Sequence, residues 1–499
     1  MSGILALETR LVLTLIVPFA GALLIAALHR KPDAREAATL GTSGVLALLV
    51  WSLLPAVANG ARPEALLVSV APGLDFALRI EPLGMLFALV AATLWIVNSI
   101  YSIGYMRAHD EPRQTIFYVC FAIAVGSAMG LAFAKNLFTL FVFYELLTIS
   151  TYPLVAHNAD EKAIRGARVY LLILIGTSML LLLPAIILTA VLGGTLDFRP
   201  GGILPPELGA GVMAALLALY MFGIGKAALM PMHFWLPTAM VAPTPVSALL
   251  HAVAVVKAGV FTVLKVVVYV FGIERLASTG ASEWLTVVAS ISLLTASAVA
   301  MTKDNLKARL AYSTVSQLAY CVLGASLAVS AGIIGGAMQI AMHAVGKITL
   351  FFCAGAIYIA AHRTEISELD GLGRKMPFTF AAFLIGSLSI IGLPPLGGSW
   401  SKWWLMLGAL DAGMIAVVVV LLVSSLLNVL YLLPIFVRGC FLPPQKLASV
   451  GAAGVELPDD LERRHWLVVL PPCITAGLCL VAFFYADTIA ALVAPIVTP

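Results

Sequence analysis

The sequence predicts an all-α protein that crosses a membrane many times. Of its 499 residues, 61% are hydrophobic and only 11% are charged, and the mean hydropathy is +1.04. A soluble core could not absorb so much apolar surface. Lipid satisfies no backbone hydrogen bonds, and strand-like alternation is absent from the chain, so the spans are expected to be helices and not strands of a barrel.

A helix needs about 20 mostly apolar residues to cross a bilayer, and about fourteen stretches meet this requirement. In chain order they are 11–28, 37–58, 81–106, 115–134, 136–157, 164–193, 211–242, 245–271, 283–302, 306–328, 331–361, 376–410, 412–437 and 466–489. The first stretch lacks a small-residue cleavage region, which indicates a retained helix and not a signal peptide. The long polar connections 59–79 and 442–464 are predicted to be surface loops.

The distribution of basic residues predicts the orientation in the membrane. Eighteen of the 29 Lys and Arg residues follow odd-numbered spans, and five follow even-numbered spans. Cytoplasmic loops are enriched in Lys and Arg. The protein is therefore expected to be a multi-pass protein of the bacterial inner membrane, with both termini in the periplasm. The net charge of +4 follows from this topology and does not indicate nucleic-acid binding.

Spans seven and twelve are expected to be broken near their middles. Span seven contains Pro231 and Pro237, and span twelve contains Pro394 and Pro395 with three glycines. Such a composition is incompatible with continuous helix, and irregular backbone at membrane depth is tolerated only inside protein or along a wet cavity. The two breaks lie five spans apart, an odd offset that is typical of inverted-repeat transporters.

This offset predicts four segments. They are an N-terminal three-helix segment (1–110), a first five-helix repeat (111–275), a second, inverted five-helix repeat (276–440), and a cytoplasmic loop with a last helix (441–499).

Ionisable residues inside the spans are the main functional signal, because charges at membrane depth are costly and usually functional. Glu145 lies near the centre of span five, and Lys226 beside the first break is its natural partner. At a separation of ~6 Å and an effective dielectric constant of about 20, their attraction is about 3 kcal/mol. Such a pair could switch the proton affinity of its neighbours; the alternative is a static ion pair that braces two helices.

The other buried basic residues extend this signal. On a regular helix, His251, Lys257 and Lys265 of span eight fall within an arc of about 120°, and His343 and Lys347 of span eleven form an i, i+4 pair. The predicted proton relay consists of Glu145, Lys226, His251, Lys257, His343, Lys347 and Lys402. Alternatively, the pair of His343 and Lys347 could satisfy buried carbonyl groups, and His251 could be a core histidine whose hydrogen bonds are satisfied. Lys265 lies nearer a helix end, where its ammonium group could extend to the membrane surface. We assign it no role in the relay.

The sequence indicates no cofactor and no metal site. Its six cysteines show no CxxC spacing, so neither a metal centre nor a disulfide framework is expected. Haem, iron–sulfur, flavin and nucleotide motifs are also absent. The chain is therefore not expected to perform redox chemistry alone, although membership in a larger redox enzyme stays open.

Several motifs resemble those of a known family, the antiporter-like membrane subunits. These subunits occur in respiratory complex I, in Mrp-type cation/proton antiporters and in membrane-bound hydrogenases. The motifs that carry the resemblance are Phe143-Tyr144-Glu145, Lys226 with 232–237, 242–251, Lys257-Ala258-Gly259-Val260, 310–317, His343 with Lys347, and Gly392-Leu393-Pro394-Pro395.

The resemblance implies fourteen helices with inverted five-helix repeats and a hydrophilic axis halfway through the membrane. It implies that Glu145 and Lys226 are the charged pair of the family, that Lys257 is the central relay lysine, and that Lys402 leads to the exit half-channel. It also implies that His251 and the pair of His343 and Lys347 lie along the connecting water chain.

Within the family, the chain is most similar to the D-type subunit of Mrp antiporters or to the smaller quinone-side subunit of complex I. Glutamate replaces Lys402 in one complex I subunit type, which argues against that type. Three interpretations follow: a subunit that exchanges protons for Na+ or K+, a proton-pumping subunit of a redox-driven complex, and a non-transporting scaffold. The first two require other membrane subunits as partners.

Overall fold

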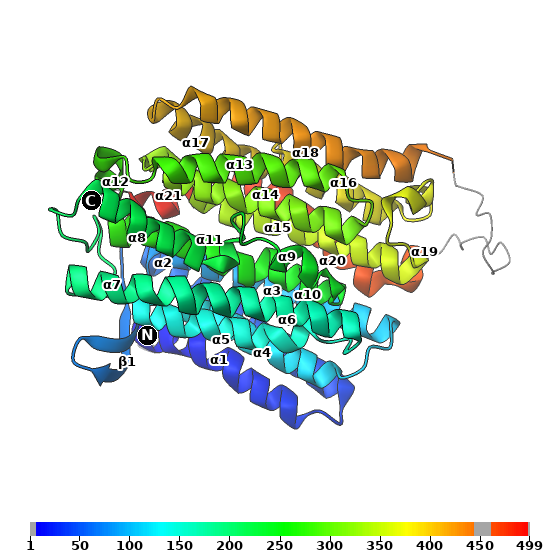
Figure 1. Ribbon diagram of the computed structural model, residues 1–499. Coiled ribbons are helices and arrows are strands. Elements are labelled where there is room, and N and C mark those ends of the chain that lie inside the picture. Colours follow the sequence, from blue (N-terminus) through cyan, green and yellow to red (C-terminus); the bar gives the residue numbers. More distant parts are fainter. Residues whose placement is uncertain (1–5, 444–460, 498–499) are drawn as a thin grey trace.

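The computed structural model describes residues 6–443 and 461–497. Long helices lie side by side in one bundle, whose ends are formed by the loops (Figure 1). The predicted loop 442–464 falls mostly outside the described residues. Helix α1 begins and the last helix, α21, ends at the same end of the bundle, as an even number of crossings requires.

The helices of the first part of the chain follow the predicted spans closely. They are α1 (Leu7–Ala27), α2 (Pro32–Ala58), α3 (Pro82–Ala108), α4 (Gln114–Ala132), α5 (Leu137–Val155), α6 (Glu161–Thr177), α7 (Leu183–Gly193), α8 (Ala210–Gly223), α9 (Trp235–Thr238), α10 (Thr244–Ala248) and α11 (Val255–Val266). A π-helical turn joins α6 to α7, so that both form one span.

The second part of the chain continues in the same way. Its helices are α12 (Ile273–Thr279), α13 (Glu283–Met301), α14 (Leu306–Ser326), α15 (Ser330–Ala361), α16 (Pro377–Ile391), α17 (Gly398–Asp411), α18 (Ile415–Phe441), α19 (Leu461–Arg464), α20 (Trp466–Phe484) and α21 (Ala486–Val493). Eleven of the predicted spans coincide with helical segments long and apolar enough to cross a membrane, counted among the described residues. The other three are α14 and the two broken spans.

Both predicted breaks are confirmed. Helix α8 ends at Gly223, and regular α-helix returns only at Trp235. Helix α16 ends at Ile391, and α17 begins at Gly398. The indole Nε1 of Trp235 donates a hydrogen bond to the carbonyl oxygen of Gly225 at 2.9 Å, and so satisfies a backbone group that the break leaves without a helical partner.

A third interruption, in span eight, was not expected. A π-helical turn (Leu249–Val253) separates α10 from α11, Ala254 has φ −119°, and a second π-helical turn (Val267–Phe271) follows α11. A π-turn adds a residue to the helical cycle. The prediction that His251, Lys257 and Lys265 share one regular helix is therefore wrong for His251, whereas Lys257 and Lys265 both lie on α11.

The connection between α2 and α3, predicted to be a surface loop, contains a β-hairpin. Strand β1 (Glu64–Ala71) pairs antiparallel with β2 (Leu74–Arg79). Gly73 in the turn has φ +77°, a conformation that favours glycine. A Pro-Gly dipeptide between two strand-like runs is the sequence signal for this turn.

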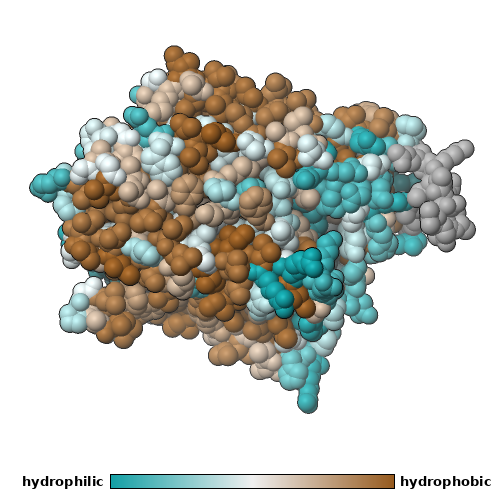
Figure 2. All heavy atoms as spheres, in the orientation of Figure 1, coloured by the Kyte–Doolittle hydropathy of each residue, from teal (hydrophilic) through white to brown (hydrophobic). Residues whose placement is uncertain are grey.

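The arrangement places span eight inside the bundle. Its most apolar window is fully buried, whereas only a third of the corresponding windows of α1 and α18 is buried. An apolar surface covers the middle of the molecule, and hydrophilic residues gather at one end, on the right in Figure 2. The basic loops that follow odd-numbered spans lie at this end, which is called the basic end below; the opposite end is called the outer end.

A buried axis of basic residues as the candidate functional site

Lys226 lies in the first break and is fully buried. Its ammonium group donates hydrogen bonds to the carbonyl oxygen of Tyr144 at 2.8 Å and to Oγ1 of Thr148 at 2.5 Å. It also lies 3.3 Å from the centroid of the Tyr144 ring. The backbone N–H of Lys226 donates to the Tyr144 hydroxyl at 3.1 Å. The break is therefore fastened to α5 by neutral oxygen atoms and an aromatic face.

Glu145 is the neighbour of Tyr144 on α5 and is also buried. Neither of its carboxylate oxygens has a hydrogen-bond partner among the described residues. The predicted pair of Glu145 and Lys226 therefore forms no hydrogen-bonded ion pair. The carboxylate still acts on the ammonium group through space.

Gly259 fixes the position of α11 against this break. A Cβ atom at Gly259 would lie 2.3 Å from the nitrogen of Ala227 and 2.3 Å from the carbonyl carbon of Lys226. No side chain fits at that separation. Because Lys257 lies two residues before this contact, the packing holds the central lysine of α11 close to the first break.

Lys257 and His343 meet across two helices. The Nζ atom of Lys257 lies 2.5 Å from Nδ1 of His343, and both side chains are buried. Two bases at this separation share one proton in their hydrogen bond. The second ring nitrogen of His343 has no partner among the described residues. The histidine is thus placed to receive a proton on one side and release it on the other.

Lys347 lies on α15 with His343, but the two residues use different partners. The Lys347 ammonium donates to Oγ of Ser313 at 2.7 Å. Ser313 in turn lies 2.9 Å from the hydroxyl of Tyr431, which donates to Oδ1 of Asn428 at 2.5 Å. A branch of hydrogen bonds therefore leads from α15 through α14 to α18.

A second branch leads toward Lys402. Nε2 of Gln339 donates to Oε1 of Gln317 at 2.9 Å, and Oγ of Ser401 donates to Oε1 of Gln339 at 2.6 Å. Lys402 follows Ser401 and donates to the carbonyl oxygen of Ile391 at 2.8 Å. The sequence-based prediction missed Gln339 and Ser401. Gln339 lies one turn before His343 on α15, and this spacing is the signal that could have found it.

His251 lies between the axis and the basic end. It is fully buried, neither ring nitrogen has a hydrogen-bond partner among the described residues, and its ring centroid lies 4.7 Å from that of Phe351. The charges of Lys347, Lys307 and Lys257 act on its ring. His251 therefore lies within electrostatic range of both Lys257 and Lys307.

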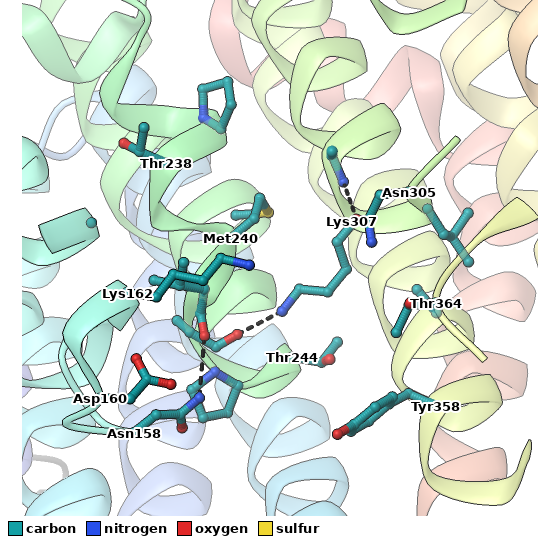
Figure 3. A pocket seen from close by; sticks show the side chains of 18 of the residues that line it. Asn158, Asp160, Lys162, Thr238, Met240, Thr244, Asn305, Lys307, Tyr358 and Thr364 are labelled. Carbon is teal, nitrogen blue, oxygen red and sulfur yellow. Dashed lines mark hydrogen bonds between the residues drawn. The ribbon is translucent and has the colours of Figure 1, made fainter. Parts of the chain in front are cut away.

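A cavity of about 780 Å³ opens at the basic end. Lys307 of α14 and Lys162 of α6 extend toward each other from opposite walls, and Lys307 donates to the carbonyl oxygen of Ala242 at 2.5 Å (Figure 3). Thr244, which begins α10, also lines the cavity. His251 follows Thr244 by seven residues, about two helical turns, so this segment leads from the cavity to the axis.

Glu111 places a negative charge in the wall of this cavity. Its carboxylate lies 3.1 Å from Nδ1 of His109 and 3.5 Å from Nε2 of His157. Burial by itself would raise the pKa of Glu111, but the hydrogen bonds and charges of His157 and His109 outweigh burial and lower that pKa. The carboxylate is therefore kept ionised at neutral pH, within the same cavity as two lysines.

Lys265 does not join the axis. Its ammonium group donates to the carbonyl oxygen of Ala134 at 2.7 Å and lies 3.3 Å from Oε2 of Glu81, at the outer end of the bundle. Glu81 precedes α3 and was not singled out from the sequence. Of the predicted basic residues, Lys257 and His343 are in direct contact and the other lysines are buried with partners of their own, whereas Lys265 belongs to a separate charged cluster.

Comparison with known proteins places the chain among membrane subunits. It is 33% identical over 359 residues to NADH-quinone oxidoreductase subunit N of Desulforudis audaxviator, an alignment that covers 71% of this chain and 70% of that protein. It is 32% identical over 412 residues to the A/B-type subunit of a probable K(+)/H(+) antiporter of Rhizobium meliloti, covering 79% of this chain and 39% of that protein. Several other curated relatives are also longer than this chain, which spans 49% and 65% of two of them.

The fold has a counterpart among solved structures. A chain in the structure of the Mrp complex from Dietzia sp. DQ12-45-1b superposes with a TM-score of 0.83 at 21% identity, covering 99% of this chain and 97% of that chain. The family model described as NADH:quinone oxidoreductase/Mrp antiporter, TM, matches residues 134–428. This match spans more than half of the chain and every axis residue from Glu145 to Lys402, so this multi-pass membrane protein belongs to the NADH:quinone oxidoreductase/Mrp antiporter family.

Proposed function

We propose that this chain moves protons across the membrane as one subunit of a larger complex. The observation that carries the proposal is the 2.5 Å contact between Lys257 and His343, two buried bases supplied by different helices. Neither residue is required for the helix of the other to form. Burying a basic side chain in a membrane is costly, so such residues usually have a function. A relay explains why both are present and why they touch.

The proposed route begins at the cavity of the basic end. A proton passes from the cavity to His251, then to Lys257 and His343, and from there toward Lys402 along the two branches through Lys347 and Gln339. Buried polar atoms without protein partners lie along this route, on His251, His343 and Gln317. Such atoms are commonly met by water in folded proteins, and water would complete the steps between side chains.

Glu145 and Lys226 are proposed to act as the switch of this relay. The Lys226 ammonium is held by neutral groups and therefore remains free to respond to Glu145. A neighbouring subunit that changes their separation would alter the positive field at Lys257. Their attraction at ~6 Å is about 3 kcal/mol, which is similar to the work of moving one charge through a potential of 100 mV, about 2.3 kcal/mol. Modest movements could thus gate the flow.

We further propose that 111–275 and 276–440 are inverted five-helix repeats, flanked by the segments 1–110 and 441–499. The support is positional: the fourth span of each repeat is broken, and a lysine lies next to each break, Lys226 and Lys402. In inverted-repeat transporters, the ion path lies at the interface of the repeats.

Among the possible complexes, we favour an Mrp-type antiporter in which this chain is the D-type subunit. Lys402 and the 32% identity to the subunit of the Rhizobium meliloti antiporter support this proposal. The similarity to subunit N of a quinone oxidoreductase supports the second candidate, a proton-pumping subunit of a redox-driven complex. Purifying the native complex and identifying its subunits discriminates between them. The exchanged ion, Na+ or K+, requires flux measurements.

Replacement of the central lysine tests the proposed relay. Lys257→Ala is expected to abolish coupled proton transport in membrane vesicles, because the proton bound between α11 and α15 is lost, while the complex still assembles. The control is Lys31→Ala, which removes a surface lysine and should leave transport unchanged. Full transport by Lys257→Ala, and by single neutral variants of Lys226 and Lys402, would support a non-transporting scaffold instead.

A further inference from the structure

Lys265 is surrounded by groups that do not belong to the proposed relay. It is fully buried, at the opposite end of α11 from the basic cavity. Besides the carbonyl oxygen of Ala134 and the carboxylate of Glu81, its ammonium group faces two aromatic rings, those of Phe198 at 4.4 Å and Phe261 at 5.6 Å. The ammonium group of this lysine therefore lies against apolar aromatic surface.

The charges around Lys265 continue toward the surface with a positive excess. Arg79 lies 2.6 Å from Glu81 and 3.6 Å from Glu64, and Lys135 lies 2.8 Å from Glu64. Side-chain exposure rises from 0% at Lys265 and 6% at Glu81 to 45% at Glu64. Three basic groups thus face two acidic groups. The cluster remains positive although each acid is paired.

Backbone covers this end of α11. The segment 194–209 follows α7, and within it Phe198 N–H donates to the carbonyl oxygen of Lys135 at 3.1 Å, while Ile203 N–H donates to that of Val270 at 3.0 Å. A Cβ atom on Gly202 would lie 2.7 Å from the carbonyl oxygen of Phe271. This end of α11 is therefore closed by backbone, in contrast to the cavity of about 780 Å³ at the basic end. A cavity of about 740 Å³ at the outer end lies elsewhere, beside α2, α3 and α21.

We propose that Lys265, with Phe198 and Phe261, forms a seal that prevents protons on Lys257 from escaping along α11 to the outer side. Lys265 follows Lys257 by eight residues, about 12 Å along a helix. A positive charge in a region of low dielectric constant repels an approaching proton or cation, as fixed cations do in selective channels, and the aromatic rings keep water from bridging the gap. The inference rests on the proposed relay. Its consequence is that protons are directed to His343.

Removal of the charge should open a leak and not simply reduce transport. We expect Lys265→Met to raise the passive decay of an imposed pH gradient by roughly tenfold, measured in membrane vesicles that contain the complete complex and no energy source. Lys265→Arg keeps the charge and should not leak. Arg199→Met removes an exposed positive charge of the segment 194–209, outside this cluster, and is the matched control; it should also not leak.

Two further variants make the result decisive. In the double variant Lys257→Ala with Lys265→Met, the leak should return to the wild-type rate, because the escape route begins at Lys257. If Lys265→Met is not inserted at the wild-type level, Lys265→Gln carries the same expectation, since its amide can still donate to the carbonyl oxygen of Ala134. A wild-type leak rate in these neutral variants, at normal protein level, would overturn the seal.

Failure of the seal and failure of the relay give different results. If Lys257→Ala abolishes coupled transport and Lys265→Met does not leak, the relay stands and Lys265 only braces the outer end. If Lys257→Ala transports normally, the proposed relay is wrong. If the leak of Lys265→Met persists in the double variant, protons reach the outer side by a path that does not include Lys257.

Discussion

At the scale of single residues, the buried lysines differ in what they bind. Lys226 and Lys402 are held by hydroxyl and carbonyl oxygens, with no carboxylate in direct contact among the described residues. Lys265, by contrast, lies beside Glu81. A direct counter-ion favours the charged form of a lysine, whereas neutral acceptors leave its charge responsive to the surroundings. We infer relay lysines from the first environment and a fixed charge from the second.

A Thr148 variant tests whether the neutral hydrogen-bond acceptors of Lys226 matter for transport. Thr148→Val keeps the shape of the side chain but removes the oxygen that accepts from Lys226 at 2.5 Å. Loss of one buried hydrogen bond to a charged group costs about 1–3 kcal/mol, so coupled transport should fall roughly tenfold while insertion is unaffected. Thr189→Val in α7, which also removes a buried hydroxyl bonded to a tyrosine, should transport normally. Equal activities of the two variants would contradict a positioning role of Thr148.

At the scale of elements, broken and π-helical segments place the polar side chains. A continuous helix satisfies its own backbone and leaves no free backbone groups for other side chains. In the broken span after α8, the backbone instead contacts α11 at Gly259 and accepts a hydrogen bond from Trp235. The π-turn before α11 carries His251. Irregular backbone at membrane depth thus coincides with the proposed proton route.

The contact at Gly259 can be tested by adding one methyl group. Gly259→Ala would force α11 away from the backbone of Lys226 and Ala227, and overpacking of this kind costs about 1–3 kcal/mol. We expect a lower thermal unfolding midpoint in detergent and reduced transport. Gly176→Ala is the control, since a Cβ atom there meets nothing within 4 Å, and should unfold at the wild-type temperature. An unchanged midpoint for Gly259→Ala would show that the two segments separate freely.

At the scale of the whole molecule, the two ends of the bundle differ. The basic end is hydrophilic (Figure 2) and contains the cavity lined by Lys307 (Figure 3). Glu111 also lines this cavity. The outer end carries the β-hairpin and the closed cluster around Lys265. If the basic end faces the cytoplasm, as the positive loops predict, the cavity takes up protons from the cytoplasm and the seal prevents their loss to the periplasm.

Labelling of exposed positions checks this orientation. Lys162 and Glu207 are exposed at opposite ends of the bundle. With a membrane-impermeant maleimide, Glu207→Cys should react in intact cells, whereas Lys162→Cys should react only after the membrane is opened. The wild-type chain, with its native cysteines, gives the background. The reverse pattern would place the basic end outside and remove the cytoplasmic uptake step.

The sequence by itself determined the spans, because the membrane requires long apolar helices and charges mark their ends. It also predicted both breaks and most of the axis, since prolines, glycines and intramembrane charges are rare enough at this depth to be read locally. The π-turns of span eight, the separate environment of Lys265, and the contributions of Gln339, Ser401 and Glu81 were decided only by tertiary structure. These features depend on which side chains of distant helices meet, and periodicity along one helix carries no information about its neighbours.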